Sequence, residues 1–170
     1  EFVQAGDMAR IAQPIDWFGL NHYCPIYARA DQNPLGFAWA DAPHDGPLTG
    51  VGWRIDPAAF RDELITAYRR YKLPIYVTEN GYGASETLDA SGAVNDGGRI
   101  SYLHAYTKAL EEAVATGTDV QGYYLWSLLD NFEWGSGYAN RFGIVYVDYA
   151  TQRRVPKASF EWFAELIRAQ

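Results

Sequence analysis

Three short apolar runs along the chain have the length and composition of buried β-strands. They cover residues 16–23, 75–79 and 120–126, where β-branched and aromatic side chains are concentrated. Between and after these runs, apolar positions recur at helical spacing over residues 57–71, 99–116 and 160–167. This alternation of strand and helix predicts an α/β fold in which parallel strands are joined by right-handed crossovers.

The first two helices have recognisable ends and faces. Asp56-Pro57 is a typical helix start, because aspartate caps the helix and proline fits its first position. Gly117 is a natural stop for the second helix. The residues expected to face the sheet are Phe60, Leu64, Ala67, Tyr68 and Tyr71 in the first helix, and Ile100, Leu103, Tyr106, Leu110 and Val114 in the second.

Long polar segments follow the strands. Residues 30–53 are rich in Gly, Pro and Asp and have no clear period, so they predict a long loop, and such loops are usually functional. Residues 82–98 predict a mobile or solvent-facing loop. Residues 127–140, after the third strand, are unusually dense in Trp, Glu, Asp and Gly.

The chain has no internal repeat and no linker that would divide it, so we expect residues 1–170 to form one domain-sized piece. Three strands are too few to close a β/α barrel, which needs eight, and they would leave exposed sheet edges. We therefore expect the chain to pair with a missing segment or with a copy of itself. It opens on Glu1 rather than Met, so it looks like the later part of something longer.

Composition and charge exclude several classes of function. The net charge of -7, without a basic stripe, argues against nucleic acid as a partner. No apolar run approaches a membrane span, and no signal peptide is visible, so the cytoplasm is the expected location. The single Cys24 excludes an internal disulfide and paired-cysteine zinc sites.

We also expect neither a metal nor a cofactor. The histidines, His22, His44 and His104, are scattered along the chain. Residues 81–86 begin like a dinucleotide-binding fingerprint, but Glu86 replaces its third glycine and no helix is predicted to start there.

Chemically useful side chains stand at the ends of all three predicted strands. Asn21 and Tyr23 end the first strand, Glu79 ends the second, and the third ends in Trp126, followed by Glu133-Trp134. Because parallel neighbouring strands end on the same side, these residues are expected to converge. Carboxylates, a phenol and indoles around one pocket suit the binding and cleavage of a sugar. Locally, Glu79 also fits an ordinary strand-capping acid, and the aromatics fit core residues.

Four segments carry a resemblance to a known family. They are Asn21-His-Tyr23, Thr78-Glu-Asn-Gly81, Trp126-Ser-Leu-Leu-Asp-Asn-Phe-Glu-Trp134 and Arg141-Phe-Gly-Ile-Val-Tyr-Val-Asp148. Together they closely resemble glycoside hydrolase family 1, the β-glucosidase family. The resemblance covers nearly the whole chain. It implies a retaining β-glycosidase on a (β/α)8 TIM barrel, of which this chain would supply the C-terminal three strand-helix units and would be incomplete without the N-terminal part.

The resemblance also implies roles for single residues. Glu79 matches the catalytic nucleophile, and Tyr23 matches the tyrosine whose hydroxyl contacts that nucleophile. Trp126 resembles the platform under the sugar. The substrate-binding residues implied beside it are Glu133 and Trp134 at the remote hydroxyls, Phe142 in the pocket lining and Asn21 near it. Phospho-glycosidases of this family tend to have serine in place of Glu133, so an unphosphorylated β-glucoside or oligosaccharide is the expected substrate.

One element of the family is absent. Its acid/base glutamate lies in an Asn-Glu-Pro segment, and this sequence contains no such tripeptide. The resemblance therefore places the acid/base residue in a missing N-terminal part, and we expect the isolated chain to be inactive in turnover. The alternative is a non-catalytic carbohydrate-binding or assembly fragment that retains the site residues for binding or packing alone.

Overall fold

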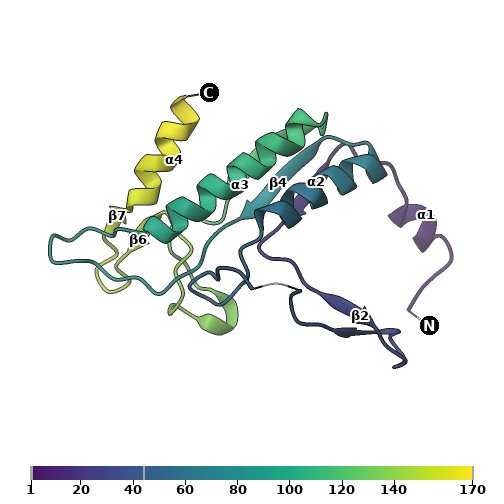
Figure 1. Ribbon diagram of the computed structural model, residues 1–170, viewed down its shortest axis with the longest axis horizontal. Helices are drawn as coiled ribbons and strands as arrows, with labels where there is room; N and C mark the ends of the chain where they lie inside the picture. The colour runs from purple at the N-terminus through teal and green to yellow at the C-terminus, as the bar shows by residue number, and fades with distance from the viewer. Residues whose placement is uncertain (1, 44, 170) are drawn as a thin grey trace.

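A three-stranded parallel sheet forms the centre of the computed structural model, which describes residues 2–43 and 45–169 (Figure 1). Its strands stand in the order β1 (Phe18–Asn21), β4 (Ile75–Asn80) and β5 (Val120–Leu125). Each is followed by a helix that returns the chain, namely α2 (Pro57–Tyr71), α3 (Gly97–Ala115) and α4 (Ala158–Arg168). The parallel strand-helix alternation predicted from the sequence is confirmed. His44 lies outside the described residues.

The hydrophobic core lies between the sheet and the two helices α2 and α3, which run side by side (Figure 1). Ile75 and Val77 alternate toward the helices and are fully buried, as the period of a strand requires. α2 begins as predicted, with the Asp56 carboxylate accepting a hydrogen bond of 3.0 Å from the Ala59 amide. Burial of an aliphatic side chain such as Ile75 or Val77 contributes roughly 1.5–3 kcal/mol to the free energy of unfolding.

The buried face of α3 overlaps the one that apolar spacing predicts but is rotated away from Val114. Val114 is 44% exposed, and Ile100 and Leu110 are only partly buried. The face toward the core instead carries two stacked tyrosines, with ring centroids 4.0 Å apart, and a buried arginine; its residues are Arg99, Tyr102, Leu103, Tyr106, Ala109 and Ala113. Leu103 and Tyr106 face the core as predicted, whereas the prediction was wrong for Val114 and missed Tyr102 and Arg99. Apolar spacing missed the arginine because its charge is accommodated by acidic partners, Glu86 and Asp96.

Two of the predicted loops contain more order than the sequence indicates. The segment after β1 forms an antiparallel hairpin of β2 (Ala28–Ala30) and β3 (Phe37–Trp39). Residues 82–98 were expected to be mobile or solvent-facing, yet Val94 and Asp96 are buried there and α3 already begins at Gly97. Buried charged side chains hold this second segment, and their pairing could not be inferred from composition.

The remaining elements are short. They are α1 (Asp7–Ile11), the 3₁₀ turn η1 (Trp134–Ser136), and the antiparallel pair β6 (Val145–Val147) and β7 (Arg154–Pro156). Within the described residues, β1 and β5 each pair with β4 alone, so both outer edges of the sheet are open. No helix in the described ranges has both the length and the apolar character that crossing a membrane requires.

Candidate active site

Backbone hydrogen bonds bring the exits of the three strands together. The His22 amide donates to the Glu79 carbonyl at 2.9 Å, and the Trp126 amide donates to the Asn80 carbonyl at 2.8 Å. These bonds continue the parallel pairing one residue beyond the regular strands. The side chains at the ends of the strands and just after them therefore start from fixed, neighbouring positions at one end of the sheet.

Tyr23 and Glu79 are in direct contact. The Tyr23 hydroxyl donates a hydrogen bond of 2.8 Å to Oε2 of Glu79. Burial raises the pKa of the Tyr23 phenol above its usual value, and the hydrogen bond to Glu79 and the negative charges of Glu79 and Glu133 raise it further. The phenol therefore stays protonated and serves as a donor to the carboxylate.

The loop after β5 contributes a second pair. Nε1 of Trp126 donates a hydrogen bond of 3.0 Å to Oε1 of Glu133, which fixes this carboxylate beside the indole. The Trp126–Ser127 peptide bond is cis. Trp134, predicted for the same pocket, is 85% exposed and stands at the start of η1. Its indole thus presents an open face to solvent.

Phe142, from the segment between η1 and β6, also contacts Tyr23. Its ring is buried, and its centroid lies 6.1 Å from that of Tyr23 in an edge-on arrangement. Gly83 permits this placement, because a Cβ at that position would come within 2.5 Å of the Phe142 ring. Trp53 joins the two aromatics, with its ring 5.3 Å from Tyr23 and 5.7 Å from Phe142.

Trp53 and Asn80 are site residues that sequence reasoning missed. Trp53 ends the long segment after β1, and the only signal for it was that long loops often carry function. Asn80 is fully buried directly after Glu79. Its side-chain amide donates to the His22 carbonyl at 2.7 Å and to the Tyr102 hydroxyl at 2.9 Å, and it accepts from the Tyr123 hydroxyl at 2.7 Å. It therefore joins the ends of β1 and β4 to β5 and to α3.

Asn21 lies apart from these contacts. Its side-chain oxygen accepts a hydrogen bond of 2.6 Å from the Thr78 hydroxyl, at an exposed position. His22 turns the other way, toward α2, where Nδ1 is 2.5 Å from Oε2 of Glu63. Among the described residues, no group of three or more His, Cys, Asp and Glu side chains is arranged to hold a metal ion.

Comparisons with known proteins agree on one family. The sequence profile of glycosyl hydrolase family 1 matches residues 1–170. A bifunctional β-D-glucosidase/β-D-fucosidase of Bifidobacterium breve is 40% identical, over 98% of this chain and 40% of the relative. A family 1 β-glucosidase structure from Thermotoga maritima aligns with a TM-score of 0.89 at 38% identity. A structure of the Thermotoga maritima enzyme in complex with glucoimidazole aligns with a TM-score of 0.88.

These alignments also set a limit on length. Both solved structures are matched over 95% of this chain but only 36% of their own chains. This chain thus spans roughly two fifths or less of the proteins that it matches. Its fold class is that of three strand-helix units of a (β/α)8 barrel, as the sequence predicted.

Proposed function

Because the chain belongs to glycosyl hydrolase family 1, we propose that it supplies the nucleophile and much of the sugar pocket of a retaining β-glucosidase. Residues 1–170 would form the C-terminal portion of a single barrel domain. The hydrogen bond of 2.8 Å between Tyr23 and Glu79 is the observation that carries this proposal. It joins a carboxylate at one strand exit to a protonated phenol from the next, which is the pairing that the family resemblance implies.

In the proposed reaction, Glu79 attacks the anomeric carbon of a β-glucoside. The bond to the leaving oxygen breaks as the glycosyl-enzyme bond forms, and an acid supplied by another part of the barrel protonates the leaving oxygen. Water then hydrolyses the intermediate and restores Glu79. Tyr23 holds the carboxylate in one orientation before attack, because its phenol stays neutral and donates.

The other site residues are proposed to bind the sugar. Trp126 offers its indole face to the ring, and its bond to Glu133 directs that carboxylate toward sugar hydroxyls. Trp134 and Phe142 extend the aromatic lining, with Asn21 at its margin. The open edges at β1 and β5 are where the N-terminal part of the barrel, or a second copy of the chain, would pair.

A second candidate function is carbohydrate binding without catalysis. The observation that favours it is the absence of any Asn-Glu-Pro segment, since retaining hydrolysis needs a second carboxyl group as acid/base. On either candidate, we expect the purified 170-residue chain to hydrolyse aryl β-glucosides negligibly. The two candidates differ in whether Glu79 can form a covalent bond.

Intact mass after incubation with a 2-deoxy-2-fluoro-β-glucoside that carries a very good leaving group separates them. Such a reagent needs a nucleophile but little help from an acid. The proposal expects one adduct, mapped to Glu79, and no adduct on Glu79→Gln. Absence of the adduct, together with sugar affinity that survives Glu79→Gln, would establish the binding function instead. A full-length family 1 enzyme labelled in parallel verifies the reagent.

A further inference from the structure

The loop that carries Glu133 has little apolar anchoring of its own. Leu128, Phe132 and Trp134 are all more than half exposed, whereas Ser127 and Asp130 are buried. Apolar burial usually fixes a segment, because it is the largest favourable contribution to folding. Here the buried side chains of the loop are polar, so their hydrogen bonds and ion pairs must determine where Glu133 and Trp126 stand.

Asp130 is the centre of those contacts, and it binds the residues on both sides of Phe142 in the chain. Its carboxylate accepts from the Gly143 amide at 3.1 Å and from Nη1 of Arg141 at 2.6 Å, the residues on either side of Phe142. Gly143 allows this approach, because a Cβ there would lie 2.2 Å from the Asp130 amide nitrogen. The position of Phe142 in the pocket is therefore set through Asp130.

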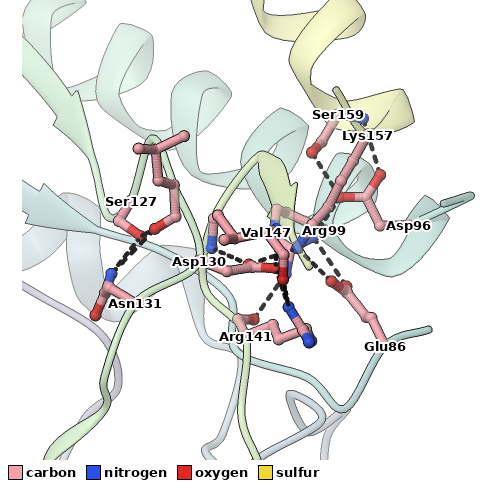
Figure 2. Close-up of polar contacts among 12 residues, drawn as sticks. Glu86, Asp96, Arg99, Ser127, Asp130, Asn131, Arg141, Val147, Lys157 and Ser159 are labelled. Carbon is pink, nitrogen blue, oxygen red and sulfur yellow. Dashed lines mark hydrogen bonds and ion pairs between the residues drawn. The ribbon is translucent and has the colours of Figure 1, made fainter. Parts of the chain in front are cut away.

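Lys157 links this arrangement to the strand that carries Glu79. Its side chain is fully buried at the start of α4, and Nζ lies 2.9 Å from Oδ1 of Asp130 and 2.5 Å from Oε2 of Glu86. Glu86 belongs to the segment that leaves β4, and Asp130 to the segment that leaves β5. Figure 2 shows the lysine reaching down from the helix into this cluster. One ammonium group thus joins the two segments on which the site residues stand.

The rest of the cluster completes the pairing of charge. Nη1 of Arg99 is 2.9 Å from Oε1 of Glu86 and also contacts Asp96, while its Nη2 donates to the Arg141 carbonyl at 2.9 Å. The acids are Glu86, Asp96 and Asp130, and the bases are Arg99, Arg141 and Lys157. The formal charges balance, which buried ionised groups require if they are to stay charged.

We propose that Lys157 is a positioning residue for the sugar pocket: it clamps the exit segments of β4 and β5 and so places Phe142 and Glu133 relative to Glu79. This inference rests on the proposed function for its consequence, since the pocket matters only if sugar binds there. Lys157 itself is buried beneath the loops and takes no part in the chemistry.

The test compares two variants with a matched control. Lys157→Met keeps the length of the side chain but leaves Glu86 and Asp130 without their shared cation. Glu86→Gln/Lys157→Met removes one charge of each sign, so the cluster stays balanced while the clamp is lost. Lys108→Met changes an exposed lysine on α3 and serves as the control. If the single variant fails to fold, the double variant decides the question.

Hydrogen exchange followed by mass spectrometry reports on the clamp in the whole chain. In the double variant, we expect residues 84–96 and 127–147 to exchange about tenfold faster while residues 57–71 are unchanged. With the fluoro-sugar reagent, the concentration for half-maximal labelling rate should rise about tenfold, and the limiting rate should change less than about threefold. Sugar binding weakens because Phe142 and Glu133 shift, whereas the nucleophile is intact.

Two results would overturn the inference. One is exchange in 127–147 that matches the Lys108→Met control; the other is half-maximal labelling at an unchanged concentration. If the wild-type chain takes no label and binds no glucoimidazole, the proposed function has failed. The exchange measurement then still decides separately whether Lys157 holds the two segments.

Discussion

Replacing Asn80 by alanine should remove much of the stability of the fold. The change deletes the amide that bonds the His22 carbonyl, the Tyr102 hydroxyl and the Tyr123 hydroxyl, all in the interior. A buried polar group left without a partner costs about 1–3 kcal/mol. The Tyr102 hydroxyl keeps a second bond of 3.4 Å to the Tyr23 carbonyl, so the groups that lose their partner are the His22 carbonyl and the Tyr123 hydroxyl. We therefore expect a loss of about 3–5 kcal/mol, cavity included.

Such a loss is a large share of the 5–15 kcal/mol that a typical domain has, so it is easily measured. Urea unfolding followed by circular dichroism gives the free energy directly if the transition is two-state. Thr78→Val is the control, because Thr78 lies on the same strand and makes one exposed hydrogen bond, whose loss should cost less than about 0.5 kcal/mol. A cost below about 1 kcal/mol for Asn80→Ala would refute the view that this amide holds the strand exits.

Three further predictions concern backbone packing, ionisation and exposure. Gly81→Ala would place a Cβ 1.9 Å from the Trp126 carbonyl oxygen, so thermal unfolding should show a free energy of unfolding lower by about 1–3 kcal/mol. Gly97→Ala at the start of α3 is the control and should show no loss, because the nearest atom to its Cβ would be 3.8 Å away. Burial raises the pKa of the phenols of Tyr23, Tyr102 and Tyr123 in the folded chain. The free energy of unfolding should therefore fall as pH rises above about 10, because these tyrosines ionise there in the unfolded chain but stay protonated in the folded one. Constant urea midpoints between about pH 8 and pH 11 would contradict this. Trp134→Ala should leave stability within about 0.5 kcal/mol, since the side chain is exposed, but weaken glucoimidazole binding in calorimetry; unchanged affinity would remove Trp134 from the proposed pocket.

The order of the elements could be predicted from the sequence because their signals are local. Asp56-Pro57 marks the start of α2, and the β-branched run ending at Glu79 marks β4, so each needs only its own neighbours in the chain. Parallel pairing then follows from the alternation of strands and helices. The proximity of Tyr23 and Glu79 follows in turn, because Glu79 lies near the end of β4 and Tyr23 comes two residues after the neighbouring parallel strand β1.

What the sequence did not reveal depends on pairing between distant segments. Lys157 and Glu86 are 71 positions apart, and nothing local to either shows that both are buried. Arg99 at helical spacing looks like a solvated position, and only its partners in the folded chain explain why it faces inward. Trp53 shares this difficulty, since its contacts with Tyr23 and Phe142 cross long loops.

Two networks of polar contacts among the described residues position the candidate site. Asn80 ties the backbone before Tyr23 to α3 and β5, and the cluster around Lys157 ties the segment of Phe142 to the segment after β4. Neither network uses the open edges of the sheet at β1 and β5. If Glu79 is the nucleophile that we propose, contacts of this kind would let it react with an activated fluoro-sugar without the rest of a barrel, whereas protonation of an ordinary leaving group would still require another carboxyl group. Covalent labelling and turnover are therefore separable properties of this chain, and we expect the first without the second.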